Sequence, residues 1–302
     1  MKLKESTLQK AFLKDSLTER LAKGLFLLCA FAVIFVTLLI TIFLFKEGIP
    51  ALIQVPLWEI FSGTVWQPSA QVPKFGILPL VTGSTVITVT TLILATPIGV
   101  GIALYLSEFS HPLEREVLKP LVELLAAIPS VVFGFFALTV VSGWIHSLFR
   151  MGTRLNALNG ILVLSLMVLP TIASISEDAL NSVPRDLKEA AYALGATKLQ
   201  VLKRVVLPYS GRGILVAILL AFGRAIGETM AVLMATGNAA VISLNLLTSM
   251  ETMTAAIAIE MGEVVFGSLH YQMLFLLGII LFLISTAVNL VADYLVTRGK
   301  VD

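Results

Sequence analysis

The chain has 302 residues, of which 57% are hydrophobic and only 13% are charged, and its mean hydropathy is +0.95. Soluble globular domains are closer to half apolar and a quarter charged, so this composition excludes an ordinary water-soluble domain. The formal net charge of +2 says little in total, but the distribution of the charges along the chain is informative.

Six apolar stretches are long enough to cross the hydrocarbon core of a bilayer, which takes about 20 residues of helix. They are residues 24–45, 76–106, 117–145, 157–176, 213–236 and 271–296. The first is too long for the apolar core of a secretory signal and runs into Lys46 and Glu47, so we interpret it as a retained span. The single Cys29 lies in this span and excludes an intrachain disulfide. We predict an all-α polytopic membrane protein with six transmembrane helices.

The basic residues predict the orientation of these spans. With the N-terminal segment 1–23 inside, 16 of the 21 Lys and Arg residues fall in inner segments, four fall in outer segments, and Arg224 lies within a span. Basic residues accumulate on the cytoplasmic side of membrane proteins. We therefore expect cytoplasmic N- and C-termini, the latter as a tail of residues 297–302, and two long outer loops at 46–75 and 237–270.

The two outer loops are the first candidates for contacts outside the membrane. Trp58 and Trp66 in the first loop predict an interfacial cap, because Trp favours the headgroup level. The second loop mixes apolar and polar residues, which predicts an amphipathic helix along the outer face. Either loop could form a lid or receive a partner.

Prolines interrupt several predicted spans and are compatible with ordinary kinks or with hinges. They are Pro79, Pro97, Pro120, Pro129 and Pro170. His111, His146 and His270 fall in separate predicted loops, so we expect isolated surface histidines and neither a metal site nor a catalytic cluster.

The inner loop 177–212 carries two consecutive helix signatures. Pro184 suits a first-turn position and Gly195 suits a left-handed cap, which predicts a short alanine-rich helix between them. Thr197 with Gln200 three residues later matches a capping box. We expect the second helix to end at Pro208.

The first of these helices is suited to contact with another protein. Ala190, Ala191 and Ala193 present small side chains that allow close approach, and Glu189 offers an acceptor to a basic partner. The alternative is a solvated connection, but loops longer than about 12–15 residues are usually functional or disordered. We favour a docking role.

A specific resemblance supports that role. Glu189-Ala190-Ala191, three further residues, Gly195, nine further residues and then Val205, one residue, Leu207 and Pro208 resemble the EAA loop of ABC importer permeases, E-A-A-x3-G-x9-I-x-L-P, with Val205 in place of Ile. The resemblance implies the type I importer permease fold with a core at 76–296, and a loop that inserts into an ATP-binding subunit. It assigns ATPase coupling to the following residues: Glu189, Ala190, Ala191, Gly195, Leu207 and Pro208.

The chain has no G-x-x-x-x-G-K-[ST] loop that could bind ATP phosphates. We therefore expect a transport subunit that is not an enzyme and carries no cofactor. ATP and Mg would bind to a separate ATPase, of which the resemblance implies two copies.

Arg224 and Glu228 are spaced four residues apart in the fifth predicted span, so we expect them to touch on one helix face. A charge at membrane depth costs from about 2.5 to over 10 kcal/mol and normally faces a cavity or a partner. The pair is either a buried structural ion pair or part of a translocation path, in which the guanidinium contacts a phosphate-like anion.

Further segments resemble the phosphate-specific branch of these permeases, in particular its C-type subunit. The resemblance covers about residues 75–296 and rests on residues 75–79, 127–134, 223–229 and 267–271. It implies an inorganic phosphate importer in a bacterial or archaeal cytoplasmic membrane. The implied partners are a second homologous permease, an extracytoplasmic phosphate-binding protein and membrane lipid, with no nucleic acid.

Three alternatives remain open at this point. The cargo could be another tetrahedral oxyanion, such as sulfate or molybdate. A secondary transporter could couple to protons through Arg224 and Glu228, although no clear repeat is present. The chain could also be an assembly module that only anchors partners.

Overall fold

The structure is a computed structural model that describes residues 2–149 and 153–298. These residues are mostly helical, and six helices among them are long and apolar enough to cross a membrane. They are Thr18–Gln54, Leu78–Phe109, Ser130–Phe149, Ala157–Asn181, Lys198–Ile226 and Leu269–Val296. The prediction of an all-α polytopic protein with six spans is confirmed, but two of the predicted spans are misplaced.

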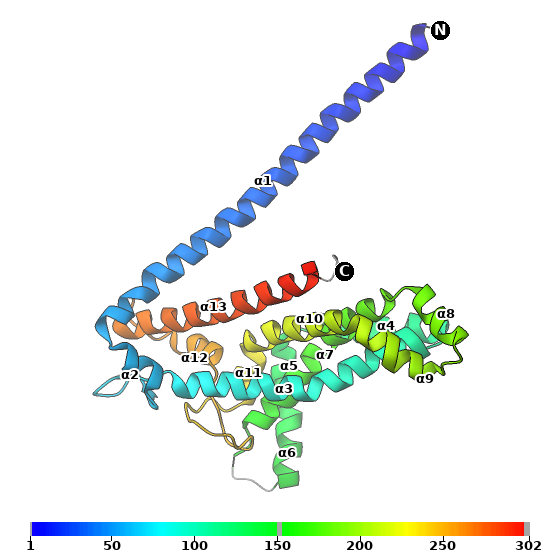
Figure 1. Ribbon diagram of the computed structural model, residues 1–302. Coiled ribbons are helices and arrows are strands. Elements are labelled where there is room, and N and C mark those ends of the chain that lie inside the picture. The colour runs from blue at the N-terminus through cyan, green and yellow to red at the C-terminus, as the bar shows by residue number, and fades with distance from the viewer. Residues whose placement is uncertain (1, 150–152, 299–302) are drawn as a thin grey trace.

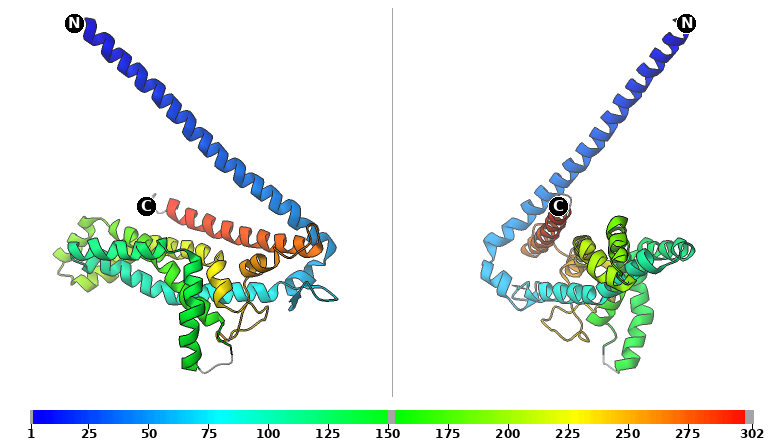
Figure 2. Two further views of the ribbon diagram at one scale, coloured as in Figure 1. Left: turned by 180° about the vertical axis from the view of Figure 1, so that it is seen from behind. Right: turned by 45° about the vertical axis from the view of Figure 1, so that its right-hand side comes forward.

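Helix α1 (Lys2–Gln54) stands away from the rest of the molecule (Figure 1, Figure 2). None of its most apolar window is buried within the chain. Contact with α13 (Leu269–Arg298) begins near the C-terminal end of α1, where the rings of Phe43 and Phe275 meet edge-on at 5.5 Å between centroids. The helix continues beyond the predicted end at Phe45 as far as Gln54, so the outer loop begins later than predicted.

A small cap follows α1. It consists of α2 (Leu57–Ser62) and a hairpin of β1 (Trp66–Gln67) and β2 (Lys74–Phe75). Trp66 is buried with its ring against those of Phe75 and His270, whereas Trp58 is exposed. The prediction that the cap places tryptophan at the membrane surface is therefore wrong for Trp66, because this ring fills the space between the hairpin and α13.

Three helices pack together at the centre of the body: α3 (Leu78–Leu104), α7 (Ala157–Asn181) and α10 (Leu207–Ile226). Helix α7 is the most buried of the spans, with 67% of its apolar window inside the chain. The backbones of α3 and α7 approach closely at Gly99, where a Cβ would lie 2.7 Å from Ile172 Cγ2. Small residues at such positions allow membrane helices to make close van der Waals contact.

The third predicted span, residues 117–145, is wrong as a continuous helix. The chain breaks at Ile128 and Pro129, whose ψ angles are 125° and 141°. A proline disfavours the helical conformation of the residue before it, so Pro129 separates an amphipathic helix from the crossing segment. The parts are α4 (Pro112–Ala127), α5 (Ser130–Phe136), the π-helical segment η2 (Ala137–Val141) and α6 (Ser142–Phe149). Figure 2 shows α6 projecting from the body.

The fifth predicted span, residues 213–236, is also displaced. Helix α9 (Lys198–Val201), the π-helical segment η3 (Leu202–Val206) and α10 run continuously to Ile226, and Gly227–Thr229 separates α10 from α11 (Met230–Ala235). Pro208 therefore does not end the second helix as predicted. It occupies the first turn of α10, where the missing N–H costs little, directly after the wider π-helical turn.

The second outer loop is not a surface helix. Gly237 and Asn238 both have positive φ, and the chain then runs without regular structure to the short helix α12 (Met253–Glu260). The first turn of α12 is buried, and Met250 and Met253 are at most 1% exposed. The predicted amphipathic surface helix is wrong, because these apolar side chains fill the space between α3, α11 and α13.

Candidate functional site

The loop 177–212 forms capped helices at the end of the molecule opposite the cap (Figure 1). Helix α8 (Arg185–Ala193) follows Pro184, and Gly195 ends this unit with φ of +79°. Thr197 N–H donates to Gln200 Oε1 at 2.8 Å, and Gln200 N–H donates to Thr197 Oγ1 at 3.4 Å. The left-handed glycine and the capping box are confirmed.

The predicted coupling residues differ in exposure. Those that are exposed are Glu189, Ala190, Gly195 and Pro208, and those that are half-buried are Ala191 and Leu207. The two half-buried residues pack against an apolar cluster that includes Val183, Val201 and Val206. Helix α8 therefore presents Glu189 and Ala190 outward while its other face fixes it to the body.

Ion pairs attach the α8 end of the molecule to the core. Glu177 near the end of α7 has a side chain only 1% exposed, and it lies 2.5 Å from Arg115 Nη2 and 3.2 Å from Lys119 Nζ, both on α4. Lys188 of α8 pairs with Glu108 at 2.5 Å, within the π-helical segment η1 (Tyr105–Phe109) that extends α3. The Lys188–Glu108 pair connects α8 with the extension of α3, and the pairs of Glu177 connect α7 with α4.

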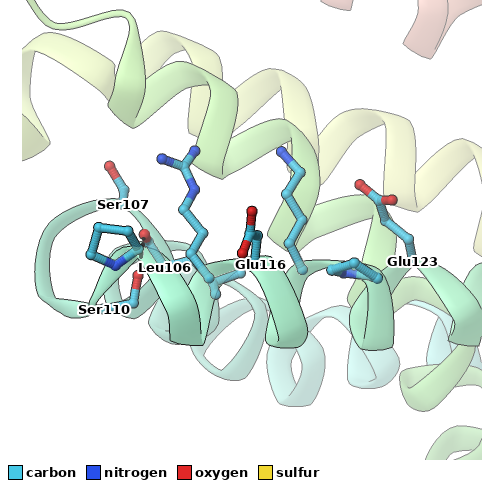
Figure 3. Close-up of a pocket in the computed structure, with 9 residues that line it drawn as sticks. Leu106, Ser107, Ser110, Glu116 and Glu123 are labelled. Carbon is cyan, nitrogen blue, oxygen red and sulfur yellow. Dashed lines mark hydrogen bonds between the residues drawn. The ribbon is translucent and has the colours of Figure 1, made fainter.

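Figure 3 shows a pocket of about 500 Å³ between η1 and α4. Ser107 and Ser110 lie at one end, and Glu116 and Glu123 follow along α4. Arg115 and Lys119 also line the pocket while contacting Glu177. Its two basic side chains are thus balanced by acidic ones, so the pocket is not selective for an anion.

Arg224 and Glu228 do not pair, and the prediction that they touch is wrong. The reason is the helix end at Gly227, because spacing of four residues places side chains together only on a continuous helix. Arg224 is exposed on the single chain, with Nη1 3.4 Å from Thr171 Oγ1 of α7. Glu228 instead accepts a hydrogen bond from Ala231 N–H at 3.1 Å and so caps the start of α11.

His270 is not an isolated surface residue, contrary to prediction. Its Nε2 lies 2.5 Å from Glu260 Oε2, and Trp66 Nε1 donates to Glu260 Oε1 at 2.8 Å. Trp66 comes from the cap and Glu260 from α12, and these two residues are 194 positions apart in the sequence. Nearby Glu251 is 7% exposed, and its burial together with the negative charge of Glu260 raises its pKa to about 7.

The sequence alone does not mark Glu108, Glu177 or Glu251 as functional residues. Glu177 directly follows an apolar stretch, and Glu251 lies in an outer segment that has no Lys or Arg, which are weak signals for acidic residues in need of partners. Their ion-pair partners are at least 58 residues away, or absent, and helix patterns cannot show such contacts. Among the side chains that the structure describes, in residues 18–149 and 153–296, no three metal-ligating groups gather at one point.

The solved structures most useful for comparison are importer permeases. The chain aligns with one from the MetNI methionine ABC transporter at 21% identity and a TM-score of 0.52, covering 73% of this chain and 94% of the other. It aligns with one from a bacterial alginate ABC transporter, in complex with an alginate-bound periplasmic protein, at 17% identity and a TM-score of 0.57, covering 88% and 94%. The fold is therefore that of a type I ABC importer permease.

The sequence comparisons define the family. The model for the binding-protein-dependent transport system inner membrane component matches residues 95–301. A probable ABC transporter permease protein, YqgH of Bacillus subtilis, is 37% identical over 90% of this chain and 89% of its own. The phosphate transport system permease protein PstC of Mesorhizobium japonicum is 36% identical over 80% and 79%. This chain belongs to that inner membrane family and is a multi-pass protein of the cytoplasmic membrane.

Proposed function

We propose that the chain is the C-type permease subunit of an ATP-driven inorganic phosphate importer. The observation that carries this proposal is the exposed helix α8, which an ion pair holds to the extension of α3 and which is followed by the predicted left-handed Gly195. A force applied to such a helix reaches the end of α3 directly. Relatives named as phosphate transport permeases support the choice of phosphate.

The orientation follows from charge. The basic residues favour a cytoplasmic position for the α8 end and for both termini. Two ATP-binding subunits would then dock onto the EAA loops of this chain and of a second homologous permease, and ATP with Mg would bind to those subunits. An extracytoplasmic phosphate-binding protein would deliver the anion at the opposite end, and the chain itself would catalyse no reaction.

Arg224 is our candidate for contact with phosphate along the path. It is exposed on the single chain within a span, and a guanidinium presents paired donors that suit a phosphate oxyanion. The proton-coupled alternative used Arg224 and Glu228 together, and these two side chains do not touch in the structure. Glu228 instead stabilises the helix break beside Arg224.

ATP-dependent uptake of radiolabelled phosphate into proteoliposomes tests this function. We expect uptake by the assembled transporter, competition by arsenate and little competition by sulfate or molybdate. Arg224→Ala should reduce uptake at least tenfold, whereas Arg154→Ala, an exposed arginine in an outer segment, should leave it within twofold. Equal uptake by Arg224→Ala and the wild type would exclude a role of Arg224 in the path.

Docking of the ATPase needs a separate measurement. Gly195→Val places a side chain where φ is +79°, so the turn must change and copurification of the ATPase should fall severalfold. Gly262→Ala, in open space at the other end, serves as the control. Undiminished copurification with Gly195→Val would exclude the loop as the docking element.

A further inference from the structure

A second pocket lies at the end of the molecule away from α8, between the cap and α12. Its volume is about 700 Å³, and its walls come from the hairpin turn after β1, from the segment between α11 and α12, and from α12 itself. We call it the cap pocket. The residues of its wall that matter here are Pro68, Ala70, Asn238, Glu251, Ile259 and Glu260.

The cap pocket contains two carboxylates in different situations. Glu260 has partners for both oxygens, because Trp66 donates to one and His270 contacts the other. Glu251 is 93% buried, and among the described residues its carboxylate has no hydrogen-bond or ion-pair partner. Burying a carboxylate without a partner is unfavourable. The carboxylate of Glu251 therefore lies at the wall of the pocket without a group that compensates its charge.

The charge of the pocket selects its ligand. None of the described residues that line it is basic, so an anion such as phosphate would be repelled. A cation would pair with Glu251 and would also lie near the carboxylate of Glu260. Pro68, Ala70 and Ile259 provide apolar surface, which matches the methylene stem of a long basic side chain better than a hydrated metal ion.

We propose that the cap pocket receives a lysine or arginine side chain of the extracytoplasmic binding protein, and that Glu251 is the residue that pairs with it. This inference rests on the proposed function, which places the pocket on the outer face and supplies the partner. Charge complementarity of this kind orients a docking protein and excludes wrong partners.

The position of the pocket suits such a contact. Helix α12 begins two residues after Glu251, and Thr254 Oγ1 on this helix donates to the backbone carbonyl of Glu228 at 2.8 Å. Met253 N–H donates to Ser84 Oγ of α3 at 2.9 Å. A side chain docked at Glu251 would therefore be linked through the start of α12 to the helix break that follows Arg224.

Direct binding tests the inference. The complete transporter with its ATPase is placed in nanodiscs and titrated at pH 7.5 with the purified binding protein that stimulates its ATP hydrolysis. We expect Glu251→Gln, which keeps the shape and removes the charge, to weaken binding at least tenfold. Glu263→Gln, an exposed acid in the same outer segment but outside the pocket, should stay within twofold of the wild type.

Salt provides the second readout. Raising NaCl from 50 to 500 mM should weaken binding to the wild type more than binding to Glu251→Gln, because the variant has lost a charge pair. Equal affinities and equal salt dependence of Glu251→Gln and the wild type would overturn the inference and leave the proposed function intact. If no binding protein associates with the wild-type transporter, both the inference about Glu251 and the proposed function are wrong.

Discussion

Glu251 makes the stability of the protein depend on pH. Its ordinary pKa of 4.5 is raised to about 7 by burial and by the charge of Glu260. Between these values the folded protein holds a proton that the unfolded chain releases, so the free energy of unfolding falls as pH rises from about 4.5 to 7 and stays low above that range.

Glu251→Gln should therefore stabilise the protein at alkaline pH. A pKa raised from 4.5 to about 7 corresponds to a gain in the free energy of unfolding of roughly 3 kcal/mol at pH 8 and to almost none at pH 4. Thermal unfolding in detergent at the two pH values measures the difference, with Glu263→Gln as the control. A gain of the same size at pH 4 and pH 8 would contradict this account.

Glu177 supports the α8 end through charge. Its buried carboxylate contacts Arg115 and Lys119, and loss of such a group leaves two cations without their acceptor. We expect Glu177→Gln to destabilise the protein by about 1–3 kcal/mol and to make α4 more accessible to protease. The neighbour Asp178 has a side chain 75% exposed and approaches Lys119 only to 4.0 Å, so Asp178→Asn should change neither measurement.

At the residue scale, the sequence predicted the interactions that are local. The capping box of Thr197 and Gln200 and the left-handed Gly195 depend on the nearest residues only, and both are confirmed. The contact between Arg224 and Glu228 failed because Gly227 ends the helix between them. Glu177 could not be assigned a partner, because Arg115 lies 62 residues away on a helix whose packing no local pattern reveals.

At the scale of the elements, the packing of α3 against the outer loop depends on one glycine. A Cβ on Gly83 would lie 2.1 Å from the carbonyl oxygen of Glu251, which is backbone and cannot turn away. Gly83→Ala should therefore displace the chain around Glu251 and lower the unfolding temperature by several degrees.

Gly101, on the same helix α3, is the matched control for this prediction. A Cβ there meets no atom within 4 Å, and alanine favours a helix over glycine by roughly 1 kcal/mol. Gly101→Ala should leave the unfolding temperature unchanged or slightly higher. A similar loss of stability in both variants would show that the Gly83 contact is not the cause.

Apolar length predicted the number of spans but not all of their ends. The stretch 117–145 combined the amphipathic helix α4 with the start of a crossing segment, and only the break at Pro129 separates them. The outer loop 237–270 was assigned to the surface because it contains polar residues. Its apolar residues instead fold inward at α12, which depends on the space between α3 and α13.

At the scale of the whole molecule, the proposed orientation can be tested with single cysteines. In a Cys29→Ser background, Leu194→Cys after α8 and Val72→Cys in the cap both lie at exposed positions, 90% and 73% respectively. A membrane-impermeant maleimide should label Val72→Cys in intact cells and Leu194→Cys only in inside-out vesicles. The reverse labelling pattern would show that the proposed orientation is wrong, with the cap on the cytoplasmic side and the α8 end outside.

The exposure of Arg224 has a consequence for the cell that makes this protein. On a chain without its partners, the guanidinium would face lipid, at a cost from about 2.5 to over 10 kcal/mol, and α1 would stand apart from the body. An orphan subunit therefore carries a charge that distinguishes it from an assembled one. We expect membrane quality control to remove surplus copies, so that the amount of this chain follows the supply of its partner permease.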